Sequence, residues 1–171
     1  MLIYGIDPGI TGGIARINHD GKLLDGIRMP TTNIWGGAKQ KKKIVDAMAV
    51  KDFIQCQTSA DTNYRQHRTY VAIERVHSMP TDARSAAFSF GRSFGAVEAI
   101  ACCQVGAGAV TWITPQVWKK FYNLSRVKGE SIALAQTHFR RDYRWKYKAD
   151  EGIAEAALIA LYYLTTNTFS A

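Results

Sequence analysis

The chain has 171 residues, which predicts one domain spanning residues 1–171 with a core of its own. Its 22 basic and 14 acidic residues give a net charge of +8, which favours a polyanionic partner, nucleic acid before a membrane. We expect no membrane segment or signal peptide, because no apolar stretch is long enough and the first one has no basic residues before it. Three cysteines without zinc-type spacing are typical of free thiols in a reducing cytosol.

The first half of the chain predicts three strands followed by a helix. Residues 2–7, 12–18 and 22–29 are expected to form an antiparallel meander, with His19-Asp20-Gly21 as a turn. Residues 30–40 predict a loop. Apolar residues at helical spacing predict an amphipathic helix over 41–57, with Lys41, Lys42 and Lys43 as its solvated start, and residues 58–68 predict another loop.

The second half alternates strands and helices. Strands are expected at 70–74 and 110–113, with a loop over 75–83 and a helix over 84–104. Thr114 and Pro115 indicate the start of a further helix, and two more are expected at 129–140 and 151–166. This order predicts a mixed five-stranded α/β sheet flanked by helices.

Acidic residues occur where these elements can bring them together. Asp7 and Glu74 each end an apolar run, so they lie side by side if the two strands are parallel neighbours. Glu151 and Glu155 share one helix face, whereas Asp150 points elsewhere on an ideal helix unless it precedes the first turn. Together these carboxylates predict an oxygen-only site for divalent metal, as in nucleases that use two ions.

Each acid also has a simpler interpretation. Asp7 can cap its own turn, and Glu74 can pair with a basic residue such as Arg75. Asp150 and Glu151 can merely complement the dipole at a helix start. Small residues beside Glu155 (Ala154, Ala156 and Ala157) favour a helix face that packs closely on the sheet, and this supports the metal-site interpretation.

Three segments resemble the acidic motifs of RuvC-type Holliday junction resolvases. They are Gly-Ile-Asp-Pro-Gly at 5–9, Ala-Ile-Glu-Arg-Val at 72–76 and Ala-Asp-Glu-Gly-Ile-Ala-Glu-Ala-Ala at 149–157, and the last is most similar to bacteriophage members. The resemblance implies an RNase H-like fold and a cytoplasmic homodimer. It also implies an endonuclease that resolves four-way junctions and other branched DNA in recombination and repair, with two Mg²⁺ or Mn²⁺ ions per site.

By this resemblance Asp7, Glu74 and Glu155 are metal ligands. Bacterial members carry an acid or histidine three residues before the last acid, where this chain has Gly152. Glu151 is therefore favoured as the fourth ligand, with Asp150 as the alternative. A second departure is His77, which stands where bacterial members insert an aromatic wedge into the junction.

Basic residues supply the expected DNA contacts. The segment 139–148 interleaves bases with aromatics, which predicts DNA-binding roles for Arg140, Arg141, Arg144 and Lys146; the alternative is a helix end whose rings fill the core. The resemblance to RuvC-type resolvases also implies that a lysine near residue 119 assists catalysis. Lys120 is the first choice, Lys119 and Lys128 remain open, and all three are candidate DNA contacts.

Small residues along the helix at 84–104 (Ala87, Gly91, Gly95 and Ala99) predict close approach of another helix, within the monomer or across a dimer.

Two other function classes are compatible with parts of this pattern. Residues 7–12 also resemble the phosphate loop of sugar kinases and actin-like ATPases, but those proteins need two such domains and 171 residues are too few. A DNA-binding protein without catalysis would keep the basic residues, yet it has no need for Asp7, Glu74 and Glu155.

Overall fold

A computed structural model of the chain describes residues 1–36, 40–59, 68–76, 83–125, 127, 129–139 and 145–167. Its centre is a five-stranded mixed sheet in the order β3-β2-β1-β6-β7. The strands are β1 (Leu2–Asp7), β2 (Gly13–Asn18), β3 (Leu23–Arg28), β6 (Thr69–Glu74) and β7 (Val110–Ile113). The first three form the predicted antiparallel meander, and β6 and β7 continue the sheet parallel to β1.

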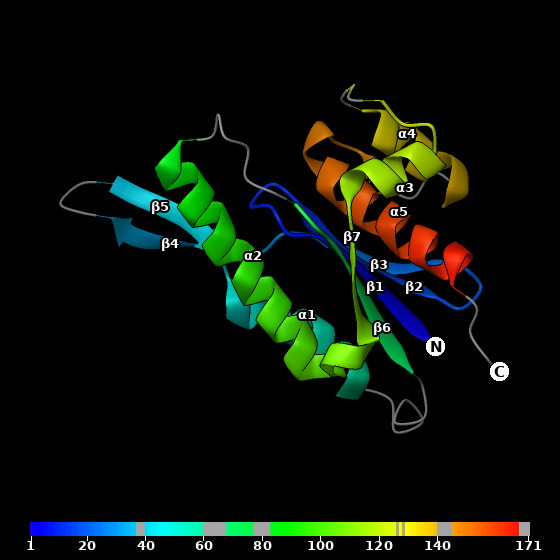
Figure 1. The fold of residues 1–171 in the computed structure, drawn as a ribbon, viewed down its shortest axis with the longest axis horizontal. Coiled ribbons are helices and arrows are strands. Elements are labelled where there is room, and N and C mark those ends of the chain that lie inside the picture. Colours follow the sequence, from blue (N-terminus) through cyan, green and yellow to red (C-terminus); the bar gives the residue numbers. More distant parts are fainter. Residues whose placement is uncertain are drawn as a thin grey trace.

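Helices cover both faces of this sheet, as Figure 1 shows. One group is α1 (Ala47–Ser59) and α2 (Arg84–Val105), and the other is α3 (Pro115–Phe121), α4 (Glu130–His138) and α5 (Glu151–Thr166). Two 3-10 turns precede β7 and α5, at Ala107–Ala109 and Lys148–Asp150. The mixed five-stranded sheet flanked by helices is therefore confirmed. No helix in the described ranges is long and apolar enough to cross a membrane.

A β-hairpin replaces the predicted loop at 30–40 and the start of the predicted helix. Strand β4 (Thr31–Gly36) pairs antiparallel with β5 (Gln40–Val45), so Lys41 to Lys43 belong to a strand and not to a helix start. Helix α1 begins only at Ala47, because Asp46 ends the hairpin and its Oδ1 accepts a hydrogen bond from the Ala49 amide at 3.1 Å. The sequence does not predict this strand, because the three lysines interrupt the alternation of apolar and polar residues by which strands are recognised.

Helix α5 lies unusually close to the sheet. Its small residues Ala154, Ala156 and Ala157 are fully buried, as predicted. A Cβ added at Gly5 of β1 would strike the backbone of Ala156, and one added at Gly152 would strike the backbone of Gly12, with which Gly152 forms an isolated β-bridge. Glycine at these two positions therefore allows α5 to lie close to β1 and to the turn that follows it.

Candidate metal site

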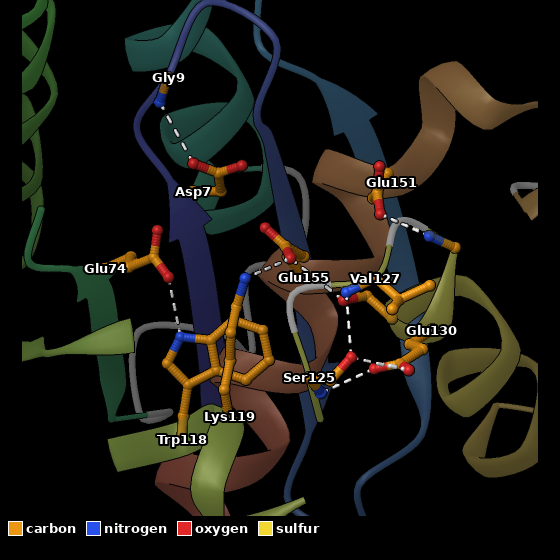
Figure 2. Close-up of polar contacts among 12 residues, drawn as sticks. Asp7, Gly9, Glu74, Trp118, Lys119, Ser125, Val127, Glu130, Glu151 and Glu155 are labelled. Carbon is orange, nitrogen blue, oxygen red and sulfur yellow. Dashed lines mark hydrogen bonds and ion pairs between the residues drawn. The ribbon is translucent and has the colours of Figure 1, made fainter. Parts of the chain in front are cut away.

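Asp7 and Glu74 lie at the same edge of the sheet, as predicted. Strands β1 and β6 are parallel neighbours whose last registered pair is Ile6 with Ile73, so the next residue of each is the acid. Glu155 approaches from α5, and its charge acts on both strand-end carboxylates. Figure 2 shows the three side chains around one shared space. Residues distant in the sequence thus form an acidic cluster consisting of Asp7, Glu74 and Glu155.

Two carboxylates of this cluster, those of Asp7 and Glu74, resist ionisation. Burial, followed by the charges of Glu74 and Glu155, raises the pKa of Asp7 from 3.8 to about 8, although the Gly9 amide donates to its Oδ1 at 3.3 Å. Burial also raises the pKa of Glu74, with a further contribution from the charge of Glu155. Such mutual repulsion in a partly buried space favours a cation among the three.

Lys119 of α3 supplies one positive charge to the cluster. Its Nζ lies 2.8 Å from Glu155 Oε1, which also accepts a hydrogen bond from the Ser131 hydroxyl at 3.1 Å. Burial by itself lowers the pKa of Lys119. The hydrogen bond to Glu155 and the negative charges of Glu155, Glu74 and Asp7 outweigh burial, so the pKa of Lys119 lies above its ordinary value. Lys119 is therefore fully charged at neutral pH.

The first choice for the lysine at the acids, Lys120, is not the residue that the fold brings there. Pro115 fixes the first turn of α3, and this phase turns Trp118 and Lys119 toward the cluster while Lys120 remains exposed. Each residue of a helix is rotated by about 100° from the one before it, so Lys120 lies about 200° round α3 from Trp118 and faces away from the cluster. Lys128 lies outside the described residues.

Two contacts of the cluster had not been anticipated. The indole N–H of Trp118 donates to Glu74 Oε1 at 2.9 Å, and Ser131 holds Glu155 from α4. The only signal for Trp118 in the sequence is indirect, namely its position beside Lys119 and Lys120, which are predicted as candidate DNA contacts. No local pattern marks Ser131, because its role depends on how α4 packs against α5.

The two candidates for a fourth ligand differ in their surroundings. Asp150 is buried and accepts from Arg28 at 2.6 and 2.9 Å and from the Tyr147 amide at 2.8 Å, so both of its oxygens are engaged away from the cluster. Glu151 accepts a hydrogen bond from the Gly129 amide at 2.8 Å and lines the same cleft as Glu155. Of the two, only Glu151 therefore lines this cleft, and its role as a fourth ligand remains a prediction.

A cleft of about 1010 Å³ opens over Asp7 and Glu155. Asp7, Glu151 and Glu155 contribute carboxylates to its walls. Four basic side chains from four different elements also line it, namely Arg28, Lys43, Lys119 and Lys148. Glu130, at the start of α4, does not line the cleft, and its carboxylate accepts hydrogen bonds from the amide and the hydroxyl of Ser125 at 2.7 and 2.9 Å. The cleft thus combines an acidic floor with basic walls.

The donor chemistry of the cluster fits a hard divalent cation, because it is made of carboxylate oxygens that repel one another. Among the residues that the structure describes, however, no three Asp, Glu, His or Cys side chains stand close enough to hold a metal as arranged. Lys119 instead engages Glu155. Metal binding by these acids would therefore require their side chains to move closer together.

Several predicted DNA contacts cannot be placed. His77, Arg140, Arg141 and Arg144 lie outside the described residues. Lys146 is exposed, and its ammonium lies over the Tyr147 ring, 5.6 Å from the ring centre, in a cation–π contact. The other described aromatics of this segment, Phe139 and Trp145, pack into the core, which matches the alternative interpretation for those rings.

The small-residue face of α2 is open on this chain. A Cβ added at Gly91 or Gly95 would meet no atom within 4 Å in the described structure, so no described helix packs tightly against these glycines. The prediction of close helix approach within the monomer is therefore not fulfilled at this stripe, and the prediction of a dimer remains untested.

Comparison with solved structures supports the RNase H-like class of fold. The chain is similar to the structure of T. thermophilus RuvC in complex with Holliday junction substrate, at 20% identity and a TM-score of 0.57 over 94% of this chain and 91% of that one. A second Thermus thermophilus RuvC structure gives 16% identity and a TM-score of 0.49 over 97% of each chain. No family model and no curated protein matches the sequence.

Proposed function

We propose that the protein is a metal-dependent endonuclease that cuts branched DNA, with four-way junctions as its principal substrate. The observation that carries this proposal is the acidic cluster, because three carboxylates from β1, β6 and α5 share one partly buried space under a basic cleft. Such a grouping destabilises the fold unless a cation binds there. A protein that only binds DNA gains nothing from it.

Asp7, Glu74 and Glu155 would hold Mg²⁺ or Mn²⁺, with Glu151 as the fourth candidate. When bound, two such ions activate water and stabilise the leaving oxygen of a phosphodiester. Lys119 neutralises Glu155 in the free protein. If a metal ion took over Glu155, the Lys119 ammonium would be available to contact a phosphate oxygen and stabilise charge that develops there.

Branched DNA is the favoured substrate for two reasons. The walls of the cleft carry Arg28, Lys43 and Lys148, which suit a phosphate backbone, and the whole chain has a net charge of +8. In addition, one of the structures similar in fold is that of a RuvC in complex with a Holliday junction substrate, which points to branched DNA in particular. A homodimer is part of this proposal, because paired nicks across a symmetric junction need two sites related by a two-fold axis.

The open glycine face of α2 is the candidate dimer interface. Sedimentation that shows only a monomer at micromolar concentration would count against it. Similarity to bacteriophage members and a cytoplasmic location remain predictions from the sequence.

The decisive experiment is cleavage of labelled four-way, three-way and linear duplex DNA with Mg²⁺ or Mn²⁺. We expect paired nicks in the four-way junction, little cutting of the linear duplex and no cutting in EDTA. Asp7→Asn should abolish cleavage while it retains binding, because the change removes a metal ligand and leaves the basic cleft intact. Binding without cleavage by the wild-type protein would support the non-catalytic alternative, and a fully active Asp7→Asn would refute the metal-site assignment.

A further inference from the structure

Trp118 makes a direct contact with one acid of the cluster. Its indole N–H donates to Glu74 Oε1 at 2.9 Å, and both partners are buried, with Trp118 0% exposed and Glu74 7% exposed. Figure 2 shows the other carboxylate oxygen of Glu74 on the side of Asp7. One oxygen is thus committed to the indole, and the other remains available at the cluster.

The indole suits this task better than other donors do. It has one N–H and no acceptor, so it stabilises the ionised carboxylate more than the protonated one and does not serve as a metal ligand. The ring is held in the hydrophobic core together with Ile113, Leu158 and Tyr163, which fixes the direction of the N–H. A hydrogen bond to a buried carboxylate also opposes the cost of keeping Glu74 charged.

Trp118 and Lys119 are adjacent on α3 but act on different acids. Lys119 ends in a flexible ammonium that binds Glu155, and it lies 5.1 Å from the centre of the Trp118 ring. The lysine can leave Glu155 when a cation arrives, whereas the buried indole cannot leave Glu74 without disrupting the core. The two contacts therefore differ in kind, one replaceable and the other fixed.

We propose that Trp118 is a positioning residue that fixes the Glu74 carboxylate, so that Trp118 sets the affinity of the acidic cluster for divalent metal. This inference rests on the proposed function, since it assumes that Glu74 is a metal ligand. Hydrogen-bond partners of metal ligands typically change metal affinity by about 10- to 100-fold when they are removed. Trp118 would be such a partner although it never touches the metal or the DNA.

Trp145 provides a matched control within the same core. It is 3% exposed, and its indole N–H has no hydrogen-bond partner in the described part of the chain. Trp118→Phe and Trp145→Phe therefore remove the same atoms from the core, but only the first removes a donor from an acid. Any effect of lost packing should appear in both variants.

The experiment is calorimetric titration of each protein with Mn²⁺, without DNA. We expect Trp118→Phe to weaken Mn²⁺ binding by about 10- to 100-fold and Trp145→Phe to change it by less than about threefold. In a Glu74→Gln background, Trp118→Phe should have no further effect on Mn²⁺ affinity, because the carboxylate that the indole N–H positions is no longer there to bind metal. The Mg²⁺ concentration for half-maximal cleavage should rise for Trp118→Phe by a similar factor.

Equal Mn²⁺ affinities for Trp118→Phe and Trp145→Phe would overturn this inference and leave the nuclease proposal standing. If the wild-type protein binds no Mn²⁺, the proposed function itself fails. Should Trp118→Phe not fold, benzothienylalanine at position 118 replaces the N–H by sulfur and keeps the shape of the ring. Unchanged Mn²⁺ affinity in that protein would refute the role of the indole N–H equally well.

Discussion

Replacement of Asp7 by Asn should stabilise the metal-free protein at neutral pH. The pKa of Asp7 is raised from 3.8 to about 8 by burial and by the charges of Glu74 and Glu155. Between these two values the folded protein binds a proton that the unfolded chain has released. The stability of the wild-type protein therefore falls as pH rises through this window and levels off above it. Asn carries no charge at any pH and should remove this dependence.

The size of the effect follows from the same pKa. Each unit corresponds to about 1.4 kcal/mol, so the interval between 3.8 and pH 7 sets an upper limit of about 4 kcal/mol. Partial exposure of Asp7 and the nearby charge of Lys119 reduce the cost. We expect a gain of about 1–2 kcal/mol at pH 7, which is roughly 2–8 °C in Tm for a chain of this length.

Thermal unfolding in EDTA between about pH 4.5 and 9 measures this directly. Asp52→Asn is the control, because this carboxylate is exposed on α1. The Tm difference between Asp7→Asn and wild type should grow with pH, and Mn²⁺ should raise the Tm of wild type much more than that of the variant. A difference that stays constant from pH 4.5 to 8 would show that burial and repulsion do not strain the Asp7 carboxylate.

Three further predictions follow from neighbouring contacts. Lys119→Met should lower cleavage at least tenfold and lower the Tm in EDTA, because Glu155 loses its cation, whereas the exposed Lys120→Met should do neither. Gly152→Ala should lower the free energy of unfolding, measured in urea, by about 1–3 kcal/mol, because the added Cβ meets the Gly12 backbone. Gly91→Ala has open space around it and should instead raise the free energy of unfolding by about 0.5–1 kcal/mol through α2. Arg28→Met should lower the free energy of unfolding by about 1–3 kcal/mol, since it leaves the buried Asp150 carboxylate without its cation. The folded variant should still bind Mn²⁺ with the affinity of the wild type. Weaker Mn²⁺ binding would indicate that Asp150 is a metal ligand after all.

The sequence predicted the central sheet and the positions of the acids because both depend on short-range patterns. Strands β1 and β6 are apolar runs that each end in a carboxylate, and α5 repeats small and apolar residues around Glu155. The hairpin was missed because half of its second strand is lysine. In that strand, pairing with β4 outweighs the weak strand preference of the individual residues.

The partners of the acids could not be predicted in the same way. Trp118 and Glu74 are far apart in the sequence, and so are Arg28 and Asp150, so each pairing exists only after helices have packed on the sheet. The choice between Lys119 and Lys120 depended on the phase of a seven-residue helix, which a shift of one residue reverses. Contacts of this kind follow from tertiary packing and cannot be recognised from the residues next to them in the sequence.

The origin of the three acids in β1, β6 and α5 has a consequence for protein synthesis. The ribosome releases β1 and β6 first, and these strands can pair and bring Asp7 beside Glu74 while Glu155 has yet to emerge. Helix α5 then docks against β1 and β2 and completes the cluster. A nascent or prematurely terminated chain that lacks α5 therefore exposes two of the acids but not the third, and under the proposed function it is unable to cut the DNA of its own cell.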